Sequence, residues 1–297
     1  MNLKQKITRF RAYQLGNAGS SFSYYDGTNF TLIEGRLTEN SKPNVLFELE
    51  QANKKKIDIL HITSWDNDHC RPNELKEILE NLLPNKIQYP GYEPHTESGK
   101  NCQSYIKQYE KYFLDKPKNV TVDSYSPEYI NELENADDGL GYSNIIYHPR
   151  ELYENANDNS TVKLFRSGSY TLLSLGDVEK EEIANKIANS SIAKTQVDVM
   201  ILAHHGADNG FTTEKFLKAI NPRIAICSSN YDNQFSHPKQ KIRDLLYQNG
   251  IQLFTTKTGD VVIKSINEHI GEFQVFNLIS NNDKISSEYK FKSKRLE

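Results

Sequence analysis

Three apolar segments of the chain each end in residue types that can bind a metal ion. Segment 57–65 is followed by carboxylates and an imidazole, segment 169–176 by a carboxylate, and segment 197–203 by two adjacent imidazoles. The residues concerned are Asp66, Asp68, His69, Asp177, His204 and His205. Carboxylate and imidazole groups suit Zn, Mn or Fe. A turn or a helix cap explains each motif alone, but three of them at strand ends favour a metal site, because loops beyond strands carry reactive groups.

The residues between these motifs predict a mixed α/β protein. Short aromatic and β-branched runs predict strands, and apolar residues at helical spacing predict helices. The predicted strands are 7–16, 20–25, 29–35, 57–62, 161–168, 169–177, 197–206, 222–230, 251–256 and 261–266, and the predicted helices are 72–82, 104–113, 179–190, 213–220 and 237–250. This order favours a two-sheet sandwich with helices on its outer faces. Segments 161–177 and 251–266 are each expected to form a hairpin.

Composition excludes several classes of protein. The 36 Lys and Arg against 39 Asp and Glu give a net charge of −3. This excludes a nucleic-acid-binding protein whose whole surface is basic. No run approaches the roughly 18 apolar residues of a membrane span, and the first residues lack the apolar core of a signal peptide. Three scattered cysteines indicate reduced thiols. We therefore expect a cytoplasmic protein that does not enter a membrane.

The ordered motifs resemble those of metallo-β-lactamase-fold hydrolases, and specifically the hydrolase domain of ComEC-type proteins. The matching stretches cover nearly all of 8–265, and the segment Ile62–His69 lies where that family has its His-x-His-x-Asp-His motif. The resemblance implies a four-layer αβ/βα sandwich formed by a single domain over 1–278. Segment 86–150 would be a variable insert over the cleft. The polar and charged composition of 279–297 predicts a tail that is frayed or loosely docked.

The resemblance also implies roles for particular residues. Asp68 and His69 would bind the second metal of a pair, with Asp177 as the bridging carboxylate. One of His204 and His205 would complete that site, and His204 is preferred because it lies nearer the buried strand. A protonated His237 would contact the scissile phosphate or the leaving group, or it is a helix N-terminal residue without a role. The expected catalytic residues are therefore Asp68, Asp177 and His237.

The chain departs from the family pattern at the first metal site. Ser64 and Asp66 stand where the family has its first two histidines, so Asp66 would offer an oxygen ligand and Ser64 would face the substrate. His148 is either the remaining ligand or an ordinary loop residue. The substrate-binding set expected from the resemblance is Ser64, Asn159, Ser160 and Asn230. The expected cofactor is a divalent metal, Zn first with Mn or Fe as alternatives, in one or two ions per chain.

The resemblance implies hydrolysis of a phosphodiester by a water whose pKa the metal lowers. Nucleic acid is the leading substrate class. Two alternatives stay open, because one fold supports many functions. The first is a phosphoesterase acting on a small molecule, such as a cyclic nucleotide or a phosphocholine-type ester. The second is a non-catalytic binding module with a degenerate first metal site. The sequence leaves the oligomeric state and partner proteins open.

Overall fold

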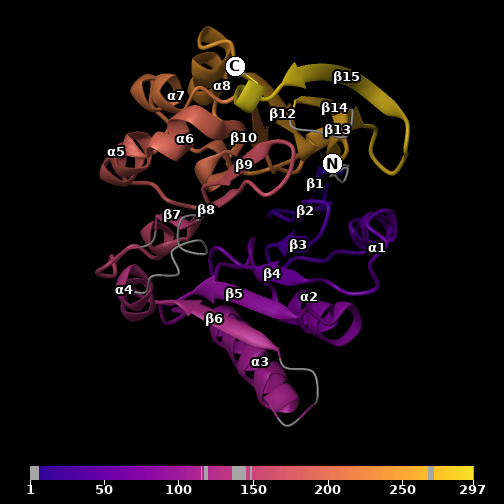
Figure 1. Cartoon of the computed structure of the whole chain (residues 1–297), viewed down its shortest axis with the longest axis vertical. Coiled ribbons are helices and arrows are strands. Elements are labelled where there is room, and N and C mark those ends of the chain that lie inside the picture. The colour runs from indigo at the N-terminus through magenta and orange to yellow at the C-terminus, as the bar shows by residue number, and fades with distance from the viewer. Residues whose placement is uncertain are drawn as a thin grey trace, which may run out of the picture.

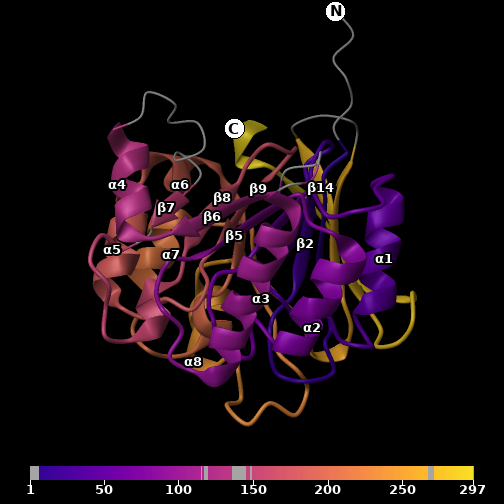
Figure 2. The same cartoon turned by 90° about the horizontal axis from the view of Figure 1, so that it is seen from below.

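The protein is a sandwich of two facing sheets with helices on both outer faces (Figures 1 and 2). The computed structural model describes residues 7–114, 116, 120–135, 145–147, 149–266 and 271–296. Side chains from both sheets, such as Phe22 and Val199, share one buried core between them. This layer order is a four-layer αβ/βα sandwich, so the expected fold class is confirmed.

The first sheet has nine strands in the order β15-β14-β13-β1-β2-β3-β4-β5-β6. Its strands are β1 (Arg9–Ala12), β2 (Phe22–Tyr25), β3 (Phe30–Ile33), β4 (Ile59–His61), β5 (Lys86–Pro90), β6 (Thr121–Tyr125), β13 (Val261–Ile266), β14 (Glu272–Leu278) and β15 (Ile285–Lys292). Strands β3 to β6 run parallel to one another. Helices α1 (Lys42–Gln51), α2 (Pro72–Glu77) and α3 (Glu97–Leu114) pack on its outer face.

The second sheet has six strands in the order β12-β11-β10-β9-β8-β7. They are β7 (Ile145–Tyr147), β8 (Val162–Phe165), β9 (Thr171–Ser174), β10 (Val197–Ile201), β11 (Ile224–Cys227) and β12 (Gln252–Thr255). Strands β9 to β12 are parallel. Its outer face is covered by α5 (Glu181–Asn189), α6 (Ser191–Gln196), α7 (Glu214–Ile220) and α8 (Gln240–Gln248). Helix α4 (Pro127–Asn135) follows β6.

One predicted hairpin forms and the other does not. Strands β8 and β9 pair antiparallel, as expected. The hairpin predicted over 251–266 is wrong, because β12 pairs with β11 in the second sheet and β13 pairs with β1 in the first. The intervening turn therefore crosses from one sheet to the other. Buried Asp260 holds it there through an ion pair with Arg11 of β1.

Two other segments differ from the expectation. The first part of segment 86–150 belongs to the sandwich and is not an insert. Strands β5 and β6 extend the first sheet as parallel strands, and α3 packs on that sheet. The polar tail is not loosely docked, because β15 pairs with β14 along its length. Buried Asp198 of β10 accepts hydrogen bonds from Ser293 Oγ and the Lys294 backbone N–H. Polar composition alone did not indicate these long-range contacts.

A row of polar side chains lies between the sheets. His61, Gln88 and Asp123 occupy one register across β4, β5 and β6. Lys163 of β8 reaches this row and donates a hydrogen bond to Gln88. Burial lowers the pKa of Lys163 to about 7, and the charge of Lys86 acts in the same direction while Asp123 opposes it. Folding therefore favours the neutral amine.

This shift predicts how stability depends on pH. Between about pH 7 and 10 the unfolded chain binds a proton at Lys163 that the folded chain releases, so this group's contribution to the unfolding free energy rises with pH. The stability of the wild type relative to Lys163→Met should increase by about 1–2 kcal/mol from pH 7 to pH 9, as measured by urea unfolding. The control Lys290→Met, at an exposed position of β15, should give a constant difference. Parallel profiles for wild type and Lys163→Met would contradict the assignment.

Candidate metal centre

The metal-ligand residues meet at one edge of the sandwich. The loops after β4, β9, β10 and β11 all leave from the carboxyl ends of parallel strands, and they carry His69, Asp177, His205 and Ser228 in turn. The carboxyl edge of parallel strands is the usual place for a ligand site in an α/β protein. The predicted strand ends therefore converge in three dimensions.

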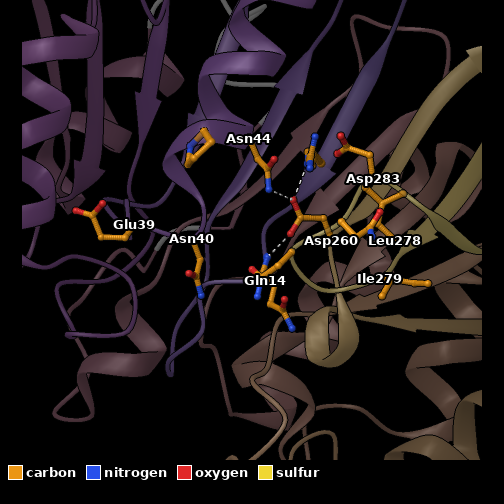
Figure 3. Close-up of a pocket in the computed structure, with 12 residues that line it drawn as sticks. Gln14, Glu39, Asn40, Asn44, Asp260, Leu278, Ile279 and Asp283 are labelled. Carbon is orange, nitrogen blue, oxygen red and sulfur yellow. Dashed lines mark hydrogen bonds and ion pairs between the residues drawn. The ribbon is translucent and has the colours of Figure 1, made fainter.

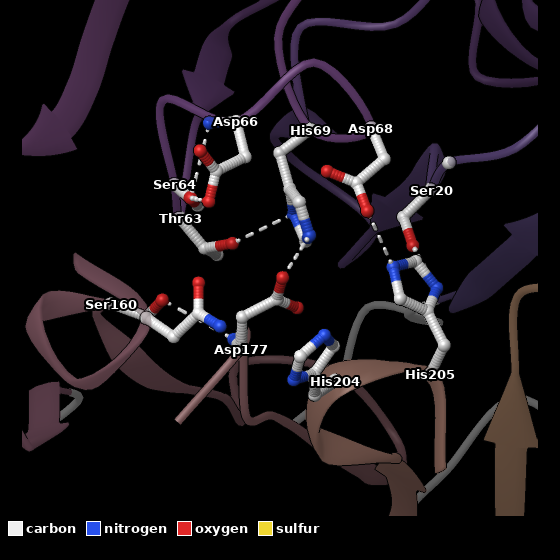
Figure 4. Close-up of polar contacts among 12 residues, drawn as sticks. Ser20, Thr63, Ser64, Asp66, Asp68, His69, Ser160, Asp177, His204 and His205 are labelled. Atoms are coloured by element: carbon white, nitrogen blue, oxygen red, sulfur yellow. Dashed lines mark hydrogen bonds and ion pairs between the residues drawn. The ribbon is translucent and has the colours of Figure 1, made fainter. Parts of the chain in front are cut away.

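Four side chains form a group with the geometry of a metal site (Figure 4). One ligand atom from each of Asp68, His69, Asp177 and His205 lies within 4.8 Å of the others. His69 Nε2 is 2.9 Å from Asp177 Oδ2, and His205 Nε2 is 3.1 Å from Asp68 Oδ2. The two nitrogens and two carboxylates face a common point, as ligands of one ion would.

Both histidines are oriented by a partner on their other ring nitrogen. His69 Nδ1 lies 3.2 Å from Glu34 Oε1, and His205 Nδ1 lies 2.8 Å from the Ser228 carbonyl oxygen. Thr63 fixes Glu34 in turn, donating from its hydroxyl to Oε1 (2.6 Å) and from its backbone N–H to Oε2 (3.0 Å). Metal-binding histidines commonly use this arrangement, which turns Nε2 toward the ion.

The backbone around the group is held in conformations that few residues adopt. Glu34, His204 and His205 have φ of 77°, 45° and 53°. Non-glycine residues at positive φ are uncommon and cluster at functional sites. Gly176, at φ 57°, precedes Asp177, and a Cβ there would lie 2.9 Å from the Ser160 Cβ. Close packing around this turn therefore fixes the position of Asp177.

A fully buried arginine ties together the loops that carry the ligands. Arg36 donates hydrogen bonds to the backbone carbonyls of Ala18 and Asn67 and pairs with Glu74 of α2. The backbone N–H of Ser20 donates to the Asp68 carbonyl at 2.8 Å. The loop that bears Asp68 is thus fixed to the loop after β1 from both sides.

The electrostatics of the group fit a cation. Burial alone would lower the pKa of His69, but the carboxylates of Asp177, Glu34 and Asp68 outweigh it and raise that pKa well above its usual range. The pKa of His205 is raised likewise, since Asp68 and Asp177 overcome burial. Buried carboxylates in excess require a nearby positive charge. The donor set of two carboxylates and two imidazoles suits a divalent metal, so these residues fit the expected cofactor.

The structure brings His205, and not the preferred His204, into this group. His204 is not in the group, and its Nδ1 lies 2.5 Å from Glu179 Oε1. Its ring also contacts that of His237. Both residues have left-handed backbone conformations, and Glu179 and the Ser228 carbonyl contact the two rings, so nearness to the buried strand does not decide which histidine joins the group.

Asp66 and Ser64 lie beside the group of four but not in it. Burial and the charges of Asp177 and Asp68 raise the pKa of Asp66. Ser64 is fully buried, and its Oγ lies 3.3 Å from Asp66 Oδ2 and 3.3 Å from Tyr92 OH. Ser64 therefore supports Asp66 and is not exposed to a substrate.

Two of the three other residues expected to bind substrate, Asn159 and Ser160, have structural partners instead. Asn159 is buried and exchanges two hydrogen bonds with the backbone of Tyr153, and buried Ser160 accepts from the Asp177 backbone N–H. These residues position the loop before β8 and Asp177 itself. Asn230 is half-buried, and its Oδ1 has no hydrogen-bond partner among the described residues. His148 lies outside the described residues.

His237 reaches the group from the loop before α8. Its ring stacks on His205 at 6.3 Å between centroids with an interplanar angle of 12°. Burial, with the charges of His205 and His204 adding to it, lowers the pKa of His237 to about 4. His237 is therefore neutral at pH 7, in contrast to the expected protonated form.

Sequence reasoning missed several residues of the centre, above all Glu34, Tyr92, Glu179 and Ser228. Of these four, only Glu34 could have been identified from its neighbours in the sequence. It directly follows the apolar segment Phe30–Ile33, and a carboxylate at the end of a buried strand has no water to solvate it. The others act through contacts with residues far away in the sequence. Neither spacing nor periodicity indicates such contacts.

A larger cavity of about 320 Å³ lies elsewhere, between the start of α1 and the strand β14 (Figure 3). At its base, Asp260 pairs with Arg11 at 2.6 Å and accepts hydrogen bonds from Asn44 Nδ2 and the Gln14 backbone N–H. These polar groups satisfy one another. Among the described residues this cavity holds no group of metal ligands.

The geometry predicts which histidine binds metal. His205→Asn should weaken zinc binding more than about 100-fold, since one of four ligands is lost, whereas His204→Asn should change it less than about tenfold. Asparagine is chosen because it tolerates positive φ. Competition with a chromogenic chelator measures both affinities. The reverse ranking would place His204 in the centre.

The support of His69 gives a second prediction. Glu34→Gln keeps the shape of the side chain but removes the carboxylate that orients the ring, so zinc affinity should fall about 10- to 100-fold. The exposed Glu39→Gln is the matched control and should bind zinc as the wild type does. Equal affinities for Glu34→Gln and the control would show that Glu34 does not orient the ligand.

Comparisons with known proteins are consistent with this fold. The chain is 25% identical over 231 residues to ComE operon protein 3 of Bacillus subtilis, and 23% identical over 219 residues to the competence protein ComA of Neisseria gonorrhoeae. These matches cover 75% and 73% of the chain but only 26% of each relative, so the chain spans about a quarter of their length. No family model matches the chain.

Two solved structures have a similar arrangement at low sequence identity. The metallo-β-lactamase fold protein YhfI from Bacillus subtilis is 12% identical to this chain. The match covers 87% of this chain and 100% of YhfI, with a TM-score of 0.47. Igni18, a metallo hydrolase from Ignicoccus hospitalis, is 13% identical, with 86% of this chain and 98% of that chain covered and a TM-score of 0.48. In sequence, the chain is similar to ComEC-type competence proteins over about three quarters of its length.

Proposed function

We propose that the protein is a metal-dependent hydrolase that cleaves phosphodiesters, with nucleic acid as the leading substrate class. The observation that carries the proposal is the group formed by Asp68, His69, Asp177 and His205, whose ligand atoms lie within 4.8 Å of one another. The similarity to two competence proteins supports it, although the chain spans only about a quarter of each.

The four residues would hold one ion, for which zinc is the first candidate and manganese or iron the alternatives. Such an ion supplies Lewis acidity and lowers the pKa of a water molecule. Asp177, held by His69 on one side and Ser160 on the other, would orient the attacking water. Neutral His237 would donate a hydrogen bond to the phosphate or the leaving group. Asp66 would offer an oxygen ligand to a second ion.

The centre is open to the surface on one side. The Asp68 side chain is 34% exposed, and the cavity among the ligands is only about 10 Å³. A substrate must therefore bring its reacting group to this edge from outside. That geometry favours a phosphodiester within a longer backbone over a small molecule enclosed in a deep pocket.

The alternatives make different demands on the same residues. A phosphoesterase for cyclic nucleotides or phosphocholine-type esters would need a pocket around the whole substrate. A non-catalytic module would have no need of the outer partners Glu34 and Ser228, which orient both histidines. The retained support of the ligands therefore favours catalysis.

Location and partners remain predictions. None of the described helices is both long enough and apolar enough to cross a membrane. A cytoplasmic location is the expectation from composition. Within this proposal, the partner is the phosphodiester substrate.

Removing the metal or the carboxylate of Asp177 should abolish activity. Treatment with a chelator, or the variant Asp177→Ala, should reduce kcat/KM on linear DNA or RNA by more than about 100-fold, because the attacking water is no longer activated or oriented. Zinc or manganese should restore the chelated wild type but not the variant. The exposed Asp244→Ala is the matched control. A wild type that cleaves no DNA, RNA or cyclic nucleotide with either metal would refute the proposal.

A further inference from the structure

An exposed aromatic side chain lies at the rim of the metal centre. Phe235 belongs to the loop between β11 and α8 and is 57% exposed. This loop leaves the same carboxyl edge of the second sheet as the ligand loops, and it projects from the sandwich beside α8 (Figure 2). Single exposed apolar residues are common on protein surfaces, so exposure alone assigns no role.

Phe235 is the outer member of a column of three aromatic rings. Its ring stacks on His237 at 5.6 Å between centroids and 25° between planes. His237 stacks in turn on the metal-ligand candidate His205, at 6.3 Å and 12°. The three nearly parallel rings therefore run from the metal centre to the surface, where the column ends in an exposed aromatic ring.

The loop is held so that this column is preformed. Asn233 accepts a hydrogen bond from the His237 backbone N–H at 2.6 Å and donates to the carbonyl oxygens of Asn230 and His237. The backbone N–H of Ser236 donates to the Asn233 carbonyl. The side chain of Asn233 thus fixes the backbone of the loop on both sides of Phe235. A preformed stacking surface costs little ordering free energy when a ligand binds.

An aromatic column that ends at the surface fits a ligand with a flat ring. Bases stack on aromatic side chains in a manner tolerant of sequence, but only when they are unpaired and accessible. The ring of His237 separates Phe235 from His205, so the partner of Phe235 would be a base beside the bond at the metal centre and not the reacting group itself.

We propose that Phe235 is a specificity-determining residue that stacks on an unpaired base of a nucleic-acid substrate, a role that rests on the proposed function. The substrate class is therefore single-stranded nucleic acid of several nucleotides. Base-paired duplexes, whose bases are already stacked, and non-aromatic phosphoesters are poorer substrates.

The test compares two substrates across matched variants. The substrates are a single-stranded oligonucleotide and bis(4-nitrophenyl) phosphate, and the readout is the ratio of their kcat/KM values. Phe235→Ala should lower this ratio about 10-fold, mainly through the KM for the oligonucleotide, since stacking of one base is lost. Phe235→Trp should keep the ratio, and Tyr247→Ala, an exposed aromatic of α8, should leave it unchanged.

A strand with abasic positions near the cleaved bond tests the contact from the substrate side. If Phe235 stacks on a base, the losses from Phe235→Ala and from the abasic strand will not add, because both remove the same interaction. Additive losses, or an unchanged ratio in Phe235→Ala, would overturn the stacking role while leaving the hydrolase intact. A wild type that cleaves the small ester but no oligonucleotide also overturns it. Failure on both substrates would defeat the proposed function as well.

Discussion

Two carboxylates must face the same point at the edge of this protein, and most of the surrounding structure makes that possible. Asp177 is buried and Asp68 is half-buried, and their like charges are costly so close together unless positive charge lies between them. The imidazoles of His69 and His205 contact the two carboxylates. Glu34 and the Ser228 carbonyl hold these rings in place. The strained turns and the buried Arg36 serve the same end.

The types of residue in the centre could be predicted because they follow strand ends. Parallel strands bring their carboxyl ends to one edge, so the apolar segments before Asp68, Asp177 and the pair His204 and His205 were enough to predict that both carboxylates and one of the two imidazoles meet. The four-layer fold follows from the same pattern, since strands with apolar residues on both faces need a sheet on one side and helices on the other.

What the sequence could not predict depends on contacts between distant segments. His204 and His205 are adjacent and share a left-handed backbone, so only Glu179 and Ser228, which lie 25 and 23 residues away from them, decide which ring faces the metal centre. The hairpin expected over 251–266 failed for a similar reason. Alternating apolar residues identify a strand but not its partner, and here Arg11 and Asp260 hold the turn between two sheets.

The return of the chain to the first sheet has a consequence for synthesis on the ribosome. Strand β1 lies between β2 and β13, so it has an unpaired edge until residues 261–266 leave the ribosome. By then the whole second sheet has been made. An exposed edge strand is a template for pairing with other chains. The first sheet therefore stays incomplete until β13, β14 and β15 have been made, after the whole second sheet.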